Sequence, residues 1–399
     1  MVKQGAKTVV PRLRFPEFRQ ATSWETKPLS ALLDYERPEK YIVVNAVYQS
    51  TGIPVLTANK SFVLGHTQEV DGVYTEVPVI IFDDFTTDKK YVDFPFKVKS
   101  SAIKILKAKG DDSLKVIFEL MGAIKFQPKE HKRHYISEYQ NLEVAIPGWA
   151  EQQKIADCLM SLDEVIAAQG RKVEAIKAHK RGLMQQLFPC EGETRPRLRF
   201  PEFLDAPEWQ DVAISDLGEV VTGSTPATSQ PDYYGGNRPF VSPADISDLR
   251  FVDTTKTTLS EDGFTKVRPI RALSVLFVCI GSTIGKVAQN VNECATNQQI
   301  NAVVAKSGVC SDFIYYLLSM ESARIAKLAG KQAVPIINKS LFSAVRVMSP
   351  KFEEQLRIAD CLSSLDTRIA AESNQFAALK THKQGLMQSL FPAQSEQTR

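Results

Sequence analysis

The 399-residue sequence predicts an α+β protein: two tandem α/β domains separated by two long antiparallel coiled-coil helices, related as a pseudo-two-fold repeat. Three observations predict this class. One long stretch occurs twice, its apolar residues recur at alternating steps of four and three, and the short motif P-R-L-R-F-P-E-F precedes each domain. Steps of four and three form the seam of a coiled coil.

The repeated stretch reads I-A-D-C-L from Ile155 and again from Ile358, 203 residues later, and each copy ends in L-F-P. No gap interrupts either copy, so the two helices should have equal length. Acidic residues open both helices and basic residues close them, which complements the helix dipole. Pro189 and Pro392 end them at equivalent places. We therefore predict spacer helices over 148–189 and 351–392.

A narrow apolar stripe needs one partner helix, and the other copy is the obvious partner. We predict an antiparallel pair in which Lys180 faces Glu372 and Gln169 faces Lys383, because a polar seam residue is costly beside leucine. The same register places Ile176 against Phe376. The predicted seam consists of Leu162, Ile166, Val173, Ile176, Lys180, Leu183, Leu187, Leu365, Ile369, Glu372, Phe376, Leu379, Leu386 and Leu390.

The helices divide the chain into a first domain over 1–147, a second domain with its linker over 190–350, and a tail over 393–399. The two domains share almost no sequence, which suggests that the repeated scaffold sets geometry while the inserts select different targets. Turn signals and β-branched runs predict strands near 41–47, 52–56, 78–82, 91–99, 141–146, 239–241, 274–279, 286–289 and 302–305, and helices near 113–122 and 312–328.

Composition and motifs argue against several classes of function. No apolar run approaches the ~18 residues of a membrane helix, and the first residues resemble no signal peptide, so we expect a cytoplasmic protein. The six cysteines form no C-x-x-C pair, which disfavours a metal site. The segment Gly281–Lys286 lacks the spacing of a phosphate-binding loop, and Asp83 with Asp84 is better read as a strand-end turn than as an acid pair. We expect no catalytic site and no cofactor.

Two basic stretches remain. Between Lys89 and Arg133 there are 12 Lys/Arg against five Asp/Glu, and from Arg324 to Lys351 there are six Lys/Arg and no acid. Either stretch could be a solvated face or a nucleic-acid surface. Gln332 and Asn338 lie in the second stretch, and their amides are side chains that can read base edges.

The whole pattern resembles the specificity subunit (HsdS) of type I restriction-modification enzymes. The resemblance is strongest in the two helices and the two P-R-L-R-F-P-E-F segments, and extends to G-S-T-P at Gly223–Pro226 and T-N-Q-Q at Thr296–Gln299. It implies a non-catalytic subunit with two target recognition domains, each reading half of a split site in double-stranded DNA. The helices would space the domains and dock two modification subunits, and a restriction (motor/nuclease) subunit would join.

Because the two domains are unlike, the DNA site should be asymmetric. We expect DNA contacts from Lys60, Lys89, Lys90, Lys132, Arg133, His134 and Tyr135 in the first domain, and from Arg238, Lys286, Lys331, Gln332, Asn338 and Lys339 in the second. Two alternatives stay open: a self-sufficient DNA methyltransferase or nuclease, and a scaffold protein that does not bind DNA.

Overall fold

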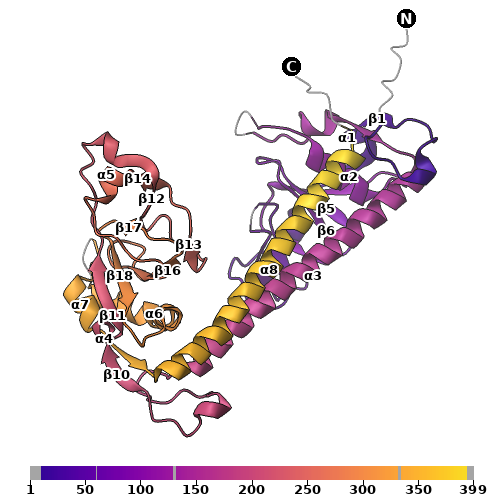
Figure 1. The fold of residues 1–399 in the computed structure, drawn as a ribbon. Helices are drawn as coiled ribbons and strands as arrows, with labels where there is room; N and C mark the ends of the chain where they lie inside the picture. The colour runs from indigo at the N-terminus through magenta and orange to yellow at the C-terminus, as the bar shows by residue number, and fades with distance from the viewer. Residues whose placement is uncertain (1–9, 60, 129–131, 331–333, 393–399) are drawn as a thin grey trace, which may run out of the picture. The chain divides into compact units, whose positions relative to one another are not determined.

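The computed structural model describes residues 10–59, 61–128, 132–330 and 334–392. It forms two compact units, one made of Met1–Gly170 with Gln375–Arg399 (unit 1) and one made of Arg171–Asn374 (unit 2). Each unit holds one α/β domain together with half of each long helix, α3 (Trp149–Leu187) and α8 (Phe352–Leu390) (Figure 1). Both helices are 39 residues long, as their gap-free repeat predicts.

The domain of unit 1 is built on three small sheets. A four-stranded antiparallel sheet has the order β2 (Leu33–Glu36), β8 (Ile103–Ala108), β5 (Val79–Asp83), β6 (Lys89–Val92). A three-stranded sheet has the order β4 (Val63–Thr67), β3 (Ile53–Leu56), β7 (Lys97–Val98), and β1 (Glu25–Pro28) pairs with β9 (Glu143–Ile146). The helices are α1 (Leu29–Leu32) and α2 (Leu114–Ala123), with 3-10 turns η1 (Pro16–Phe18), η2 (Glu39–Tyr41) and η3 (Tyr139–Asn141).

The domain of unit 2 is larger. Its main sheet has the order β11 (Gly218–Thr222), β18 (Ile300–Ala305), β15 (Val275–Val278), β16 (Val287–Asn290), β13 (Phe251–Val252). A three-stranded sheet has the order β14 (Thr257–Leu259), β12 (Tyr234–Val241), β17 (Ala295–Thr296), and β10 (Gln210–Ala213) pairs with β19 (Arg346–Ser349). The helices are α4 (Ile214–Leu217), α5 (Glu261–Phe264), α6 (Ser311–Ala326) and α7 (Lys339–Ala344), with turns η4 (Pro201–Phe203), η5 (Pro231–Tyr233) and η6 (Lys327–Ala329).

The two domains repeat one topology despite their unlike sequences. The sheet β2-β8-β5-β6 corresponds strand for strand to β11-β18-β15-β16, and the other two sheets correspond in the same way. Equivalent backbone bonds mark the match: the His134 amide donates to the Asp84 carbonyl, and the Ile337 amide donates to the Cys279 carbonyl, both at 2.8 Å. The α+β fold class is confirmed. The predicted strand at 41–47 is wrong, since η2 and an irregular segment occupy it.

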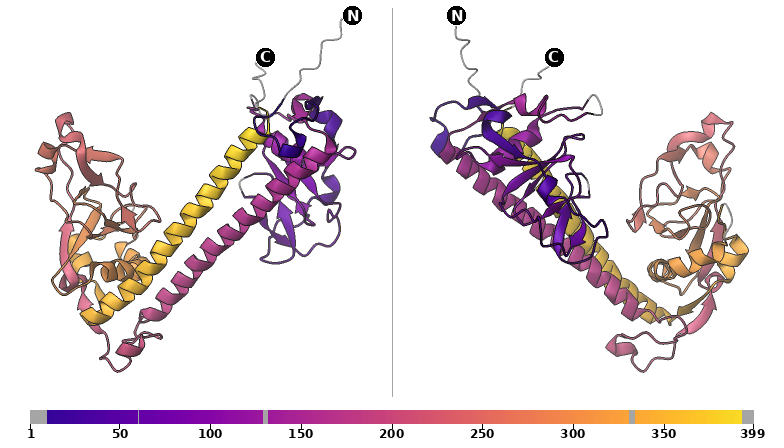
Figure 2. Two further views of the ribbon diagram at one scale, coloured as in Figure 1. Left: turned by 45° about the vertical axis from the view of Figure 1, so that its right-hand side comes forward. Right: turned by 180° about the vertical axis from the view of Figure 1, so that it is seen from behind.

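Within each unit α3 and α8 lie side by side and antiparallel (Figure 2). In unit 1 Lys383 Nζ lies 2.6 Å from Asp163, and a side chain at Gly170 would lie 3.2 Å from the Phe376 ring. In unit 2 Lys172 pairs with Glu372 at 2.6 Å, and Lys180 pairs with Asp366. From the start of α3 to its end, the contacting residues on α8 have decreasing residue numbers, so the two helices are antiparallel.

The predicted register is wrong. Lys180 pairs with Asp366 rather than Glu372, Lys383 pairs with Asp163 rather than Gln169, and Phe376 covers Gly170 rather than Ile176. The prediction assumed that polar seam residues satisfy one another. Instead each seam lysine pairs with an aspartate that flanks the seam, and the neighbouring domain supplies further polar partners. These domain groups cannot be read from helix periodicity.

The two P-R-L-R-F-P-E-F segments, Pro11–Phe18 and Pro196–Phe203, each join the end of one long helix to the start of the other; we call them the clasps. In unit 1 the Leu13 amide donates to the Ser389 carbonyl at the end of α8, while Arg14 binds Glu151 at the start of α3 through two bonds of 2.6 and 2.7 Å. Glu17 pairs with Lys154 at 3.3 Å, and the Lys154 ammonium group also lies over the Phe15 ring.

The second clasp repeats these contacts. The Leu198 amide donates to the Gln186 carbonyl at the end of α3, and Arg199 binds Glu354 at the start of α8 at 2.7 and 2.8 Å. The helix ends beyond the clasps enter the domain cores: Phe391 packs edge-on against Trp24, and Phe188 packs edge-on against Trp209. The leucine and the second arginine of the motif thus make equivalent contacts in both clasps.

Among the described residues, no helix combines the length and the apolar character that crossing a bilayer requires.

Candidate nucleic-acid interface

In the first domain, the end of β5 organises the surrounding loops. Asp83 Oδ1 accepts from the amides of Phe85 and Thr86 at 2.9 Å, so Asp83 caps a turn, as predicted. Asp84 is 1% exposed and lies 3.3 Å from the buried Lys104 Nζ on β8. Its Oδ1 also accepts from the Tyr135 amide at 2.8 Å. The carboxylate pair is therefore structural, because both members hold the loops in place.

This arrangement corrects the expectation for His134 and Tyr135. Their backbone amides bond to Asp84, which draws both side chains into the core, where they are 0% and 1% exposed. The Tyr135 ring packs edge-on against Phe82 at a centroid distance of 5.3 Å. Neither side chain is available to DNA. Their neighbours Lys132 and Arg133 are exposed, and Lys132 lies 2.9 Å from Glu138.

The rest of the first basic stretch divides into structural and accessible lysines. Three of its lysines are buried in ion pairs: Lys97 with Glu69, Lys104 with Asp84, and Lys115 with Asp163 and Glu119. Lys89 is part-buried over the Tyr139 ring, and burial lowers its pKa below the ordinary value. Lys90 is part-exposed on the same strand, and Lys60 lies outside the described residues. The stretch is therefore not one continuous charged surface.

In the second domain, three loops meet at the equivalent end of the main sheet. The Ser224 amide donates to the Thr296 carbonyl at 2.9 Å, which joins G-S-T-P to T-N-Q-Q. The Gln299 amide group donates to the Ile280 carbonyl at 3.4 Å, which joins T-N-Q-Q to the residue just before the segment Gly281–Lys286. A side chain at Gly223 would lie 2.1 Å from the Asn297 carbonyl, so only glycine permits this approach.

Polar groups suited to base edges lie on this loop cluster. Gln298 is exposed, and the Thr225 hydroxyl donates to its Oε1 at 2.6 Å, which orients the amide. Arg268 is exposed beside the same loops and donates to the Thr222 carbonyl at 2.6 Å. Glutamine amides read base edges and arginine binds both bases and phosphates. The cluster can therefore present both kinds of contact.

The DNA-contact residues predicted in the second domain lie in different environments. Arg238 pairs with Glu261 at 2.9 Å and Glu293 at 3.4 Å, so its charge is locally balanced. Lys286 donates to the Ile246 carbonyl at 2.7 Å. Asn338 caps α7 by accepting from the Leu341 amide at 2.8 Å. Lys339 is exposed at the start of α7, while Lys331 and Gln332 lie outside the described residues.

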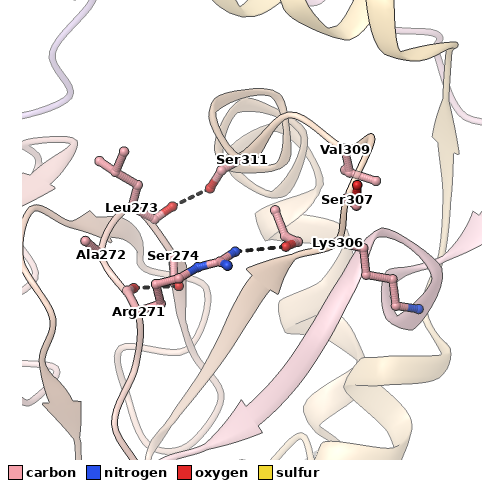
Figure 3. A pocket seen from close by; sticks show the side chains of 9 residues that line it. Arg271, Ala272, Leu273, Ser274, Lys306, Ser307, Val309 and Ser311 are labelled. Atoms are coloured by element: carbon pink, nitrogen blue, oxygen red, sulfur yellow. Dashed lines mark hydrogen bonds between the residues drawn. The ribbon is translucent and has the colours of Figure 1, made fainter.

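A shallow depression at the opposite end of β18 is a weaker candidate (Figure 3). It is lined by Arg271, Leu273, Ser274, Lys306 and Ser311, among others. Their polar groups already bond to backbone carbonyls: Arg271 to Ala305 at 3.1 Å, Ser274 to Arg271 at 2.7 Å, Lys306 to Ser215 at 2.5 Å, and Ser311 to Leu273. These bonds hold loops together, and we assign this depression no ligand.

Two thiols of the second domain are buried. Burial raises the pKa of Cys279 and Cys294 to about 12, so both remain protonated at neutral pH and are poor nucleophiles. Within residues 10–59, 61–128, 132–330 and 334–392, no group of three or more His, Cys, Asp or Glu is placed to hold a metal ion.

Comparison with known proteins identifies the family. The chain is 31% identical over 367 residues to the "Type I restriction enzyme EcoR124I/EcoR124II specificity subunit" of Escherichia coli, a match that covers 86% of this chain and 87% of that protein. This chain belongs to the type I restriction enzyme specificity subunits. Residues 207–381 also match the family described as "Type I restriction modification DNA specificity domain". The HindI specificity subunit of Haemophilus influenzae is 31% identical over 173 residues, which is 42% of this chain and 37% of that protein.

Solved specificity subunits share the fold. The S subunit of a type I restriction-modification system from M. genitalium superposes with a TM-score of 0.66 over 97% of this chain and 100% of that chain, at 13% identity. A chain from a study of "complex assembly and conformational transition of the type I R-M system" superposes with a TM-score of 0.52, at 18% identity, covering 90% and 98%. Specificity subunits recognise DNA sequence and are not themselves catalytic, and this chain is a subunit of that kind.

For this specificity subunit, sequence reasoning identified some accessible residues and missed others. Lys90, Lys132, Arg133 and Lys339 were predicted and are at least partly exposed. Thr225, Gln298 and Arg268 were not singled out. The first two lie in motifs that carried the family resemblance, so their position in G-S-T-P and T-N-Q-Q was the available signal. Arg268 lies in no such motif, and only the fold brings it to Thr222.

Proposed function

We propose that this specificity subunit reads a split, asymmetric DNA site, with one half-site read by the domain within residues 1–147 and the other by the domain within 190–350. One observation carries the proposal: the two domains have the same topology but different chemistry at the same end of the main sheet. Beside that end the first domain exposes Lys132 and Arg133, whereas the second domain exposes Gln298 and Arg268. One frame with two sets of side chains suits two different half-sites.

Exposed cations supply affinity and register by binding phosphates, and a few polar groups on base edges supply specificity. In the first domain Lys90, Lys132 and Arg133 would make these contacts, and Lys60 and Lys89 stay predicted contacts of the same domain. In the second domain Gln298, oriented by Thr225, would read a base edge. Arg268, Lys286 and Lys339 would bind phosphates or bases beside it.

The proposal also assigns partners. The chain would dock two modification subunits, and a restriction subunit would join the complex, in the cytoplasm where the DNA is. Apolar side chains that are exposed at equivalent positions of the two repeats support two equivalent docking surfaces. Leu13 and Leu198 on the clasps are 43% and 41% exposed, and Trp149 and Phe352 at the helix starts are 59% and 38% exposed. Exposed apolar groups at equivalent places are suited to two copies of one partner.

The test combines the purified chain with its modification subunit. The chain alone should bind no methyl donor and transfer no methyl group, whereas the mixture should methylate adenine at a split DNA sequence. Methyl transfer to labelled genomic DNA, followed by sequencing of the modified positions, measures both. Methylation or cleavage by the chain alone would favour a self-sufficient enzyme. A mixture that shows no salt-dependent DNA binding would favour a scaffold.

A further inference from the structure

The helix pair offers the same three side chains to each domain. In unit 1 they are Gln152 and Asp163 of α3 and Lys383 of α8, which we call the first triad. In unit 2 they are the repeat-equivalent Gln355 and Asp366 of α8 and Lys180 of α3, the second triad. Each triad meets one domain helix, α2 in unit 1 and α6 in unit 2, and each glutamine binds the start of that helix. Gln152 Oε1 accepts from the Ser113 amide at 2.7 Å, and Gln355 Oε1 accepts from the Cys310 amide at 3.0 Å.

In unit 1 the two charged members of the triad, Asp163 and Lys383, close a ring of four charges with two residues of α2. Lys115 Nζ lies 2.7 Å from Asp163 and 2.9 Å from Glu119, and Lys383 Nζ lies 2.6 Å from Asp163 and 3.1 Å from Glu119. Each carboxylate therefore contacts two ammonium groups. Lys115 and Glu119 are buried, at 8% and 4% exposure. The alternation of two cations and two anions fixes α2 against both long helices at once, because any rotation of the domain separates at least one pair.

In unit 2 the same triad meets different chemistry. The Tyr316 hydroxyl of α6 donates to Asp366 Oδ2 at 2.6 Å, and Lys180 Nζ lies 5.1 Å from the centre of the Tyr316 ring. Arg250 donates to the Tyr316 hydroxyl at 2.9 Å and to Ser363 at 2.8 Å, and pairs with Asp312 at 2.6 Å. Since Cys310 corresponds to Ser113, Tyr316 occupies the place of Glu119. The helix-borne triad is thus constant within the chain while the domain-borne partners differ.

We propose that the two triads are positioning residues for DNA recognition: they hold each recognition domain at one angle on the helix pair and so fix which separation of half-sites the subunit accepts. This inference rests on the proposed split-site function. A ring that served stability alone would need no repeat-equivalent triad facing a domain of different composition. A constant triad is what two different domains require if both must be held in the same way.

The test measures preference for the gap between half-sites. After sequencing of methylated genomic DNA has given the site, synthetic duplexes carry both half-sites at the native gap, one base pair shorter and one longer. Asp163→Asn removes one charge of the ring with little change of shape. In complex with its modification subunit, this variant should lose about tenfold of the preference for the native gap, as expected for losing one charge-assisted hydrogen bond. Its preference for bases within each half-site should stay unchanged.

Several variants sharpen the result. Glu119→Gln removes a second charge of the same ring and should give the same loss, Asp366→Asn tests the second triad, and Asp163→Glu should restore the preference. The exposed Asp157→Asn on the same helix is the matched control. The inference would be overturned if folded Asp163→Asn and Glu119→Gln kept the gap preference of the parent. It would also be overturned if Asp157→Asn lost as much of that preference as they do. Neither result would affect the proposed function. A parental complex that methylates no split site would overturn the proposed function as well.

Discussion

At the scale of single residues, one arginine in each unit joins the clasp to the start of a long helix: Arg14 in unit 1 and Arg199 in unit 2. Arg14 and Arg199 each bind a glutamate at the start of a long helix and donate to two carbonyls of their own segment, at 2.8–2.9 Å. Arg199 and Glu354 are 7% and 2% exposed, so neither charge is well solvated. Removing one member of such a pair leaves the other charge buried without compensation.

Arg199→Met should therefore destabilise unit 2 strongly. We expect a loss of about 3 kcal/mol in the free energy of unfolding, the lower end of the range for breaking a buried ion pair. Arg195→Met is the control, because Arg195 and its partner Glu208 are 56% and 58% exposed, and its change should stay within about 0.5 kcal/mol. Urea denaturation followed by tryptophan fluorescence measures both. Equal effects of the two substitutions would contradict the role given to the clasp.

Substitutions at Arg133 and Tyr135 should separate DNA recognition from stability. Tyr135→Ala should cost about 3 kcal/mol of stability, since its buried ring packs against Phe82. Arg133→Ala should leave stability within about 0.5 kcal/mol but weaken DNA binding and relax the first half-site. Thermal unfolding and mobility shift on cognate duplex distinguish the two. An Arg133→Ala variant that binds DNA like the parent would remove Arg133 from the interface.

The sequence indicated that this segment matters but not which side chains face outward. A cluster of cationic and aromatic residues suggests a nucleic-acid surface, but the sequence pattern is the same whether these side chains are exposed or buried. The outcome was decided by Asp84, whose backbone and carboxylate bind the amides of residues 134 and 135. Such a contact joins positions 50 residues apart, and short-range patterns contain no signal for it.

At the scale of elements, the long helices were the most predictable part. Apolar spacing, terminal charges and prolines predicted that the helices exist, the gap-free repeat predicted their equal length, and the pseudo-two-fold repeat with its polar seam residues predicted the antiparallel pairing. The register was not predictable from the helices alone, because Asp163 and Asp366 are satisfied jointly by the opposite helix and by α2 or α6. The strand β8 escaped prediction for a related reason: Lys104 interrupts its apolar run, yet is buried against Asp84.

Lengthening both helices should lengthen the gap in the DNA site. Seven residues inserted after Gly170 in α3 and seven after Ser373 in α8 keep the side-chain phase and leave the ion pairs of both units intact. The insertion adds about 10 Å at ~1.5 Å per residue, close to three base-pair steps. Sequencing of methylated DNA should return the same half-sites with a longer gap. An unchanged gap would show that the helices do not set the distance.

At the scale of the whole molecule, the chain repeats one design with two sets of residues. Matching positions carry unlike side chains: Asp84 and Cys279, Lys104 and Asn301, Glu119 and Tyr316. The first domain uses an ion pair at these places, and the second domain uses a hydrogen bond. The repeat is therefore visible in the sequences of the helices and clasps but not in those of the domains. In the domains, a changed residue at one position is matched by a changed residue at the position that it contacts.

The two halves should respond separately to substitution. Gln298→Ala removes an exposed amide from the second domain's loop cluster and should cost about 1–3 kcal/mol of discrimination at one base pair of the second half-site. The first half-site should be unaffected. Gln210→Ala, an exposed glutamine on β10, is the matched control. Relative methylation of duplexes that vary one base pair at a time measures the effect. Relaxation of both half-sites by Gln298→Ala would contradict separate reading.

The central claim is that one chain with two domains of equal topology and unlike chemistry reads two unlike half-sites. The most direct measurement is single-molecule sequencing of DNA from cells that express the chain with its modification subunit, compared with cells that express the modification subunit alone. We predict one new methylated motif, made of two different half-sites separated by a fixed number of unspecified base pairs. A continuous motif, or two identical half-sites, would contradict the account.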